Sequence, residues 1–259
     1  MRNQMHSDVK VTIITVVWND AEGFLVTARS VLAQSYDNIE WIVIDGASTD
    51  GTSQYVRNLS PAISSYVIEK DTGIYNAMNK GIDRATGDWI MFMNADDAFY
   101  DERIVAYYVN NIQDDDSVLY SDVIRREDGQ IHPYLSADRY WLGMTLDHQS
   151  AFVRSDLYKQ YKFDERYRVA GDLNFISNLK AKSYKFRKLN GLICCIKPFG
   201  VGASSSYFDR QHERVNVLRT YFDGPQLITT LHAEFKKAYD SKVVTVNEFN
   251  KLLTLIGIN

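Results

Sequence analysis

The sequence is poor in the residues that build disulfide frameworks and membrane spans. Its two cysteines, Cys194 and Cys195, are adjacent, so they support neither a disulfide framework nor a zinc cluster. No apolar run approaches the roughly 20 residues of a transmembrane helix. The first residues are polar and lack the apolar stretch of a signal peptide. We therefore expect a cytoplasmic protein with at most a peripheral contact to the inner face of the cell membrane.

An excess of basic residues is also missing. Lys and Arg together number 29 against 33 Asp and Glu, which gives a net charge of -4. Proteins that bind nucleic acid usually present a basic field to the phosphate backbone, so we expect no nucleic-acid partner. A hydrophobic content of 45% and a charged content of 24% are typical of a globular protein.

The first hundred residues alternate short apolar runs with segments of helical period, which predicts a mostly parallel sheet. The helix after the second strand has possible N-caps at Ser48, Thr49 and Asp50, and the helix after the third strand has a possible C-terminal glycine at Gly87. The predicted strands cover residues 11–17, 39–44, 66–68 and 89–93.

The second half of the sequence has a more mixed pattern. Residues 118–125 and 131–134 predict a hairpin around residues 128–129, residues 182–197 predict short strands, and helices follow from residue 207. We expect a catalytic domain over residues 1–205 with a nucleotide half (9–100) and an acceptor half (101–205). A helical C-terminal extension would follow over residues 206–259. The glycine-rich residues 200–204 could be a lid or a plain surface loop.

Polar groups gather where the predicted strands end. Asp45 ends the second strand, Asp71 follows the third, and Asn94, Asp96 and Asp97 follow the fourth. Ligands of parallel α/β sheets bind beyond this edge. Carboxylates there repel a phosphate unless a hard cation lies between, so a divalent ion, Mn²⁺ or Mg²⁺, is implied. Neither a glycine-rich dinucleotide motif nor a P-loop is present.

Four segments of the first half resemble glycosyltransferase family 2. They are TIITVVWN (12–19), VIDGASTDGT (43–52), EKDTGIYNAMNKG (69–81) and TGDWIMFMNADD (86–97). The resemblance implies an α/β GT-A fold, a Rossmann-like nucleotide-binding mixed sheet that is mostly parallel and flanked by helices. It is nearest to the bacterial branch that builds colanic acid, O-antigen and capsule repeat units.

The resemblance also implies roles for individual residues on the donor side. The D-x-D motif of the family falls on residues 94–96, so its first aspartate is Asn94 here. Asp96 is the expected metal ligand, and Asp97 could share that role. The family's arginine in the third segment is replaced by Met78. The residues expected to bind the nucleotide sugar are Thr15, Val17, Asn19, Asp45, Asp71, Gly73, Asn79, Asn94, Ala95 and Asp96.

The acceptor side resembles the family segment that ends in a catalytic acidic pair. That pair is usually Glu-Asp, and Gly171-Asp172 stands in its place. Asp172 is the expected general base, although an aspartate at a helix start can also be only an N-cap. His148 and Gln149 are expected to contact a sugar, although a lone histidine is more often structural.

These assignments predict an inverting glycosyltransferase. It would move a sugar from a nucleotide sugar, with UDP preferred, to a hydroxyl of a glycan or lipid-linked oligosaccharide. The oligomeric state is not indicated. Two alternatives remain, namely a sugar nucleotidyltransferase and a catalytically silent glycan-binding module. The first would carry a glycine-rich basic loop after its first strand, and residues 17–20 are not such a loop.

Overall fold

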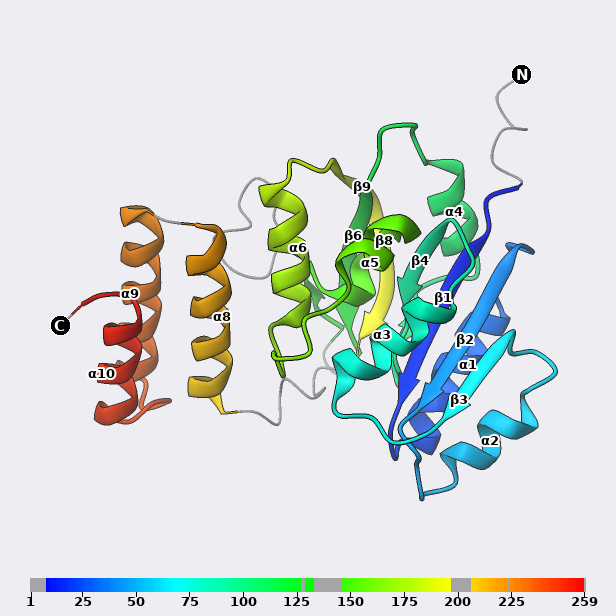
Figure 1. Cartoon of the computed structure of the whole chain (residues 1–259), viewed down its shortest axis with the longest axis horizontal. Coiled ribbons are helices and arrows are strands. Elements are labelled where there is room, and N and C mark those ends of the chain that lie inside the picture. Colours follow the sequence, from blue (N-terminus) through cyan, green and yellow to red (C-terminus); the bar gives the residue numbers. More distant parts are fainter. Residues whose placement is uncertain (1–7, 127–128, 133–145, 197–205, 223, 259) are drawn as a thin grey trace.

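A computed structural model describes residues 8–126, 129–132, 146–196, 206–222 and 224–258. In the first half, strands and helices alternate as the apolar pattern predicts (Figure 1). Residues 11–17 are all buried, as expected of a strand covered on both faces. The elements are β1 (Val11–Val17), α1 (Ala21–Leu32), β2 (Ile39–Asp45), α2 (Thr52–Asn58), β3 (Ser65–Ile68), α3 (Ile74–Arg84) and β4 (Trp89–Phe92).

The second half adds further strands and three further α-helices to the described part of the chain before the C-terminal segment. The predicted hairpin is present where the structure describes it, because β6 and β7 pair antiparallel. The elements are β5 (Ala98–Phe99), α4 (Ile104–Asn110), β6 (Val118–Arg125), β7 (Ile131–His132), the 3-10 helix η2 (His148–Ser150), β8 (Ala151–Arg154), α5 (Ser155–Tyr161), α6 (Gly171–Ala181) and β9 (Phe186–Ile196).

One sheet joins both halves. Its strand order is β3-β2-β1-β4-β8-β6-β9-β5, with β7 paired to β6. The four strands of the first half run parallel, whereas β8 is antiparallel to both β4 and β6. The expected fold class, a mixed and mostly parallel sheet flanked by helices, is confirmed.

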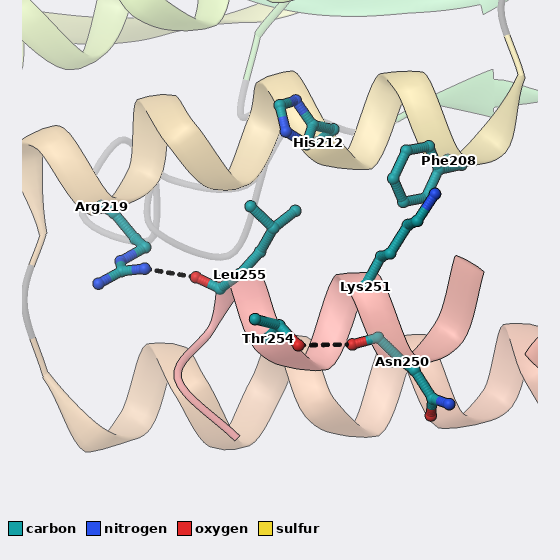
Figure 2. Close-up of a pocket in the computed structure, with 7 residues that line it drawn as sticks. All are labelled: Phe208, His212, Arg219, Asn250, Lys251, Thr254 and Leu255. Carbon is teal, nitrogen blue, oxygen red and sulfur yellow. Dashed lines mark hydrogen bonds between the residues drawn. The ribbon is translucent and has the colours of Figure 1, made fainter. Parts of the chain in front are cut away.

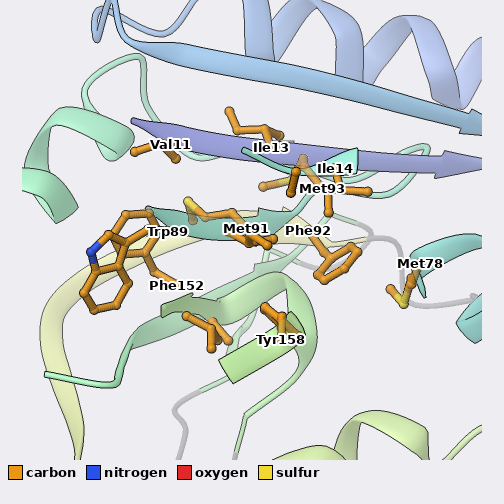
Figure 3. Close-up of a cluster of buried hydrophobic side chains, with 14 of the residues drawn as sticks. Val11, Ile13, Ile14, Met78, Trp89, Met91, Phe92, Met93, Phe152 and Tyr158 are labelled. Carbon is orange, nitrogen blue, oxygen red and sulfur yellow. The ribbon is translucent and has the colours of Figure 1, made fainter. Parts of the chain in front are cut away.

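The main hydrophobic core lies around β1 and β4. Their apolar side chains pack with residues of α3, α5 and β8 (Figure 3). Trp89 stacks on Phe152 with ring centroids 4.8 Å apart, which joins β4 to β8. Met78 is fully buried in this core.

Three helices form the C-terminal segment, and α8 packs beside α6 (Figure 1). Their apolar faces build a second cluster that includes Leu231, Phe235 and Leu252 and reaches Ala170 and Leu173 beside and within α6. Among the described residues, no helix is long and apolar enough to cross a membrane. The proposed lid, residues 200–204, lies outside the described residues. The helices are α8 (Tyr207–Tyr221), α9 (Pro225–Asp240) and α10 (Val246–Leu255).

Three local predictions differ from the structure. The N-cap of α2 is Gly51 at φ 106°, since Asp50 instead accepts hydrogen bonds from the N–H and hydroxyl of Thr52. Gly87 does not end α3, and a Cβ there would lie 2.6 Å from Thr12 Oγ1 and 2.8 Å from the Lys10 carbonyl oxygen. Residues 186–196 form one long strand in place of several short ones.

A buried carboxylate ties β2 to the end of α3. Glu40 is 8% exposed and accepts hydrogen bonds from the Thr12 hydroxyl, the Thr86 N–H and hydroxyl, and the Lys10 ammonium. Burial raises the pKa of Glu40, but these hydrogen bonds outweigh it and lower that pKa from 4.5 to about 2.

We expect Glu40→Gln to lose roughly 2 to 3 kcal/mol of unfolding free energy at neutral pH. Because the folded-state pKa is depressed, the contribution of Glu40 is present above its ordinary pKa and is lost as the pH falls toward 2. Denaturant unfolding between pH 7 and pH 3 should therefore show a flatter pH dependence for the variant. The exposed Glu102→Gln is the matched control, and equal curves for Glu40→Gln and the parent would contradict the assignment.

Candidate active site

The structure brings Asp172, His148 and Asn94 into one hydrogen-bonded chain. The His148 ring joins the other two, with Nδ1 3.1 Å from Asp172 Oδ2 and Nε2 2.8 Å from Asn94 Nδ2. All three residues are largely buried, since the side chains of His148 and Asp172 are 11% and 6% exposed and Asn94 is 8% exposed. The expected base, Asp172, is therefore linked through His148 to Asn94, the first residue of the D-x-D-like motif.

The other carboxylate oxygen of Asp172, Oδ1, accepts two hydrogen bonds. The Tyr75 hydroxyl of α3 donates to Oδ1 at 3.3 Å, and the Leu173 N–H donates to the same oxygen at 2.8 Å. Asp172 is not the N-cap of α6, because that position belongs to Ala170. The capping alternative is thus not supported. Tyr75 was not selected from the sequence, where a tyrosine at helical spacing is indistinguishable from a core residue.

Gly171 makes room for the Tyr75 ring. A Cβ at Gly171 would lie 2.7 Å from Tyr75 Cε2, closer than side-chain atoms approach one another. The ring is also held by Phe163, at a centroid distance of 5.3 Å. Gly171 replaces the first acidic residue of the expected pair. It therefore leaves room for the Tyr75 ring, whose hydroxyl contacts Asp172.

The surroundings of this chain shift two pKa values. Burial alone would lower the pKa of His148, but the hydrogen bond and charge of Asp172, followed by the charges of Asp147 and Asp97, raise it above 6.5. Burial, followed by the charge of Asp172, raises the pKa of Tyr75 well above 10. Tyr75 thus keeps its proton at neutral pH and can donate it in the hydrogen bond to Asp172.

The amide of Asn94 can match either protonation state of His148. Its Oδ1 atom is buried and has no hydrogen-bond partner in the described part of the chain, whereas Nδ2 faces His148 Nε2. This orientation suits a neutral ring that accepts at Nε2. A half-turn of the amide would place Oδ1 against a protonated Nε2.

The loop after β4 presents one of the two expected metal ligands. Asp96 has φ 71° and a side chain that is 18% exposed, and its carboxylate is paired with Arg126, which follows β6. Asp97 is 3% exposed and accepts a hydrogen bond from Gln149 at 2.9 Å. Asp97 and Gln149 therefore hold the loop, and of the expected pair it is Asp96 that is partly exposed.

The described residues alone do not provide a full set of metal ligands here. Among the described residues, no group of three or more His, Cys, Asp and Glu side chains is arranged to hold one. A Mg²⁺ ion, however, is commonly held by one or two carboxylates together with substrate phosphates. The Arg126 guanidinium is paired with the Asp96 carboxylate, so this carboxylate is positioned to bind a cation.

The ends of β1 and β2 offer exposed groups for a nucleoside. Asn19 is exposed at φ 49°, and its side chain accepts from the Thr49 N–H at 2.8 Å. Asp71 accepts from the N–H of exposed Gly73 at 3.0 Å. Trp18 is 68% exposed and lies close to Gly46 beside Asp71. Sequence reasoning missed Trp18, although an aromatic residue at a strand end is the available signal.

Other expected nucleotide contacts are buried. Thr15 is fully enclosed and accepts a hydrogen bond from Trp41 Nε1 at 3.0 Å, and Val17 is 5% exposed. Asp45 is also fully enclosed, and its oxygens accept from the hydroxyls of Ser48 and Ser53. In this structure, the hydrogen bonds of Thr15 and Asp45 are therefore made within the fold.

Two more of the expected residues, Asn79 and Ala95, make hydrogen bonds that join separate parts of the chain. Asn79 is 6% exposed and exchanges hydrogen bonds of 2.9 Å with the backbone of Phe163, and it also donates to Glu165. It therefore joins α3 to the segment before α6. The Ala95 N–H donates to the Val16 carbonyl at 3.1 Å, which fixes the loop after β4 to β1.

A separate groove lies between two of the C-terminal helices. It has a volume of about 490 Å³ and is lined by residues of α8 and α10 alone, among them Phe208, His212, Arg219 and Lys251 (Figure 2). It contains none of the residues that the sequence marks for chemistry.

Comparison with known proteins identifies the family of the chain. The model of a family described as glycosyl transferase family 2 matches residues 12–195. The chain belongs to glycosyl transferase family 2. A PGL/p-HBAD biosynthesis glycosyltransferase of Mycobacterium bovis is 30% identical over 209 residues, which cover 77% of this chain and 81% of the relative. An uncharacterized glycosyltransferase of Mycobacterium tuberculosis is 41% identical over 106 residues, which cover 40% of each chain.

Solved structures share the fold of this family 2 member. S. aureus TarS 1-349 in complex with UDP-GlcNAc aligns with a TM-score of 0.73 at 15% identity, covering 95% of this chain and 79% of that one. Mannosyltransferase PcManGT from Pyrobaculum calidifontis, in complex with GDP-Man and Mn²⁺, aligns with a TM-score of 0.67 at 19% identity and the same coverage. None of these names refers to colanic acid, O-antigen or capsule, so the expected branch is not confirmed.

We expect Gly171→Ala to destabilise the protein by roughly 1 to 2 kcal/mol, because the new methyl group meets the buried ring of Tyr75. Without that clash, alanine would favour the first turn of α6. Thermal unfolding measures the change. Gly224→Ala is the matched control, since its φ of 176° suits any residue and no atom lies within 4 Å of the new Cβ. A variant at Gly171 as stable as the parent would mean that Tyr75 moves aside freely.

Proposed function

We propose that the protein is an inverting glycosyltransferase that moves a sugar, hexosyl or N-acetylhexosaminyl, from a UDP-sugar to a hydroxyl of a glycan or lipid-linked oligosaccharide. The observation that carries this proposal is the position of Asp172, a carboxylate held through His148 against the motif that ends β4. Family membership supports glycosyl transfer in general. The neighbour in complex with UDP-GlcNAc supports the choice of donor.

The proposed biological setting is bacterial surface polysaccharide synthesis, the expected O-antigen and capsule branch included. The acceptor would then be assembled at the inner face of the cell membrane, where the enzyme makes peripheral contact from the cytoplasm. The support is the resemblance of the four sequence segments to that branch.

Asp172 has the geometry of a general base in a single displacement. Its Oδ2 atom accepts one hydrogen bond in the described structure, from His148, and an oxygen with two lone pairs can accept another hydrogen. As the acceptor oxygen attacks the anomeric carbon, its proton passes to Asp172 and the bond to the nucleoside diphosphate breaks. Attack from the face opposite the leaving group inverts the anomeric carbon. Tyr75 and His148 orient the carboxylate.

A divalent ion, Mn²⁺ or Mg²⁺, is proposed to bind at Asp96 together with the donor phosphates. When bound, it supplies positive charge for the departing diphosphate. The neighbour in complex with GDP-Man and Mn²⁺ supports this choice. Asp96 is the carboxylate ligand, and Asp97 supports the loop from inside.

The decisive assay measures which phosphate product appears when donor and acceptor are both present. Release of nucleoside diphosphate supports transfer, release of pyrophosphate indicates a nucleotidyltransferase, and release of neither indicates a silent glycan-binding module. A thermal-shift screen of UDP, GDP and dTDP with and without Mn²⁺ selects the donor base beforehand, since ligands stabilise the native state that binds them.

In that assay, Asp172→Asn should bind nucleotide normally but turn over at least about a hundredfold more slowly, because the amide cannot remove a proton. Asp164→Asn is the matched control, since Asp164 pairs with Arg166 and touches none of the site residues in the contacts described. Full turnover by Asp172→Asn would eliminate Asp172 as the base and direct attention to Asp147 or Glu165.

Asp96→Ala should abolish transfer and remove the part of nucleotide stabilisation that depends on Mn²⁺, because it deletes the exposed carboxylate of the motif. Thermal shifts with UDP, with Mn²⁺ and with both measure this loss. Asp114→Ala, an exposed aspartate before β6, is the control. If Mn²⁺ still adds to the UDP shift in Asp96→Ala, then another group ligates the ion.

A further inference from the structure

Arg126 occupies the carboxylate that the proposed function assigns to a metal ion. Its guanidinium donates to the Asp96 carboxylate through Nη1 and to the Asp96 carbonyl oxygen through Nη2. The backbones of both residues are anchored. The Arg126 N–H donates to the Ile196 carbonyl at 3.1 Å, and the Asp96 N–H donates to the Gly23 carbonyl at 2.9 Å. The contact can therefore form and break by movement of the arginine side chain alone.

Once a donor diphosphate binds beside Asp96, one divalent ion does not balance all of the negative charge there. Asn94 is neutral, and Asp97 is enclosed with Gln149, so Asp96 is the negative group of the motif that faces a ligand. A diphosphate diester brings two negative charges, and one divalent ion would balance only those two. The charge of Asp96 would then be left over, and Arg126 is the cation in contact with it.

Arg126 also has the shape for a phosphate. A guanidinium presents a planar fork of N–H donors that matches two oxygens of one phosphate group, which an ammonium cannot do. Its side chain is 37% exposed, so a ligand can approach it from solvent. A diphosphate held near Asp96 lies within the reach of a side chain anchored at the end of β6.

We propose that Arg126 is a diphosphate-binding residue that exchanges partners. In the ligand-free chain it neutralises Asp96, and when nucleotide and metal bind it releases that carboxylate and binds the donor diphosphate. This inference rests on the proposed function for the identity of the ligand. It assigns to Arg126 two effects of opposite sign, since the arginine competes with the metal for Asp96 but cooperates with it in holding the diphosphate.

The test is Arg126→Gln, which removes the charge and keeps a polar side chain. Isothermal titration should show UDP binding, in the presence of Mn²⁺, weakened about ten- to a hundredfold, as expected for the loss of charge-assisted hydrogen bonds. Uridine, which has no phosphate, should bind equally to parent and variant. Binding of Mn²⁺ alone should become about two- to fivefold tighter, because a partly exposed ion pair no longer competes for Asp96.

Arg125→Gln is the matched control, because Arg125 is the adjacent residue of β6 and is exposed. It should leave all three affinities unchanged, and an unchanged melting temperature of ligand-free Arg126→Gln verifies its fold. Equal UDP affinity in Arg126→Gln and parent overturns the inference, and so does weakened UDP binding without tighter Mn²⁺ binding. If the parent itself binds no nucleoside diphosphate, the proposed function fails instead, so the two failures are distinguishable.

Discussion

The arrangement of the candidate site depends on the hydrogen bonds that one buried carboxylate, that of Asp172, requires. Asp172 is almost fully removed from water, and a carboxylate in that position is tolerated only where hydrogen-bond donors replace the solvent. The donors come from three separate parts of the chain: Tyr75 in α3, His148 in η2 and the Leu173 N–H in α6. Movement of α3 or of η2 relative to α6 would remove one of these donors from the buried carboxylate. The first and second halves of the chain are therefore joined at Asp172, where the proposed chemistry takes place.

The C-terminal helices also hold the start of α6, the helix that carries Asp172. Glu213 of α8 accepts hydrogen bonds from the backbone N–H groups of Val169 and Ala170, directly before the first turn of α6. A carboxylate at this end also complements the helix dipole of α6. Leu173, next to the proposed base, packs into the second hydrophobic cluster. The C-terminal helices therefore hold the turn that carries Asp172.

Sequence patterns predicted the strands of the first half well, because a run of buried β-branched residues such as 11–17 has few alternatives. The resemblance to family 2 selected Asp172, His148 and Asn94, which the fold then brought together. Residue type alone could not separate ligands from internal partners. Thr15 and Asp45 have the polar groups that a nucleotide needs, yet Trp41, Ser48 and Ser53 use those groups inside the fold. Tyr75 and Arg126 were missed because their roles arise from contacts 97 and 30 residues away in the chain.

The edge that looks strongly acidic in the sequence is largely compensated in the folded protein. Asp96 is balanced by Arg126, Asp172 is bonded to an imidazole whose pKa its own charge raises, and Asp45 is enclosed among hydroxyl groups. Asn94 adds to this effect. Since an amide both donates and accepts, it can pair with His148 whether or not Nε2 carries a proton, whereas an aspartate could only accept and would favour the imidazolium. A neutral residue at this position therefore limits the repulsion that an approaching diphosphate meets, and it leaves Asp96 as the exposed negative group of the motif that a cation can neutralise.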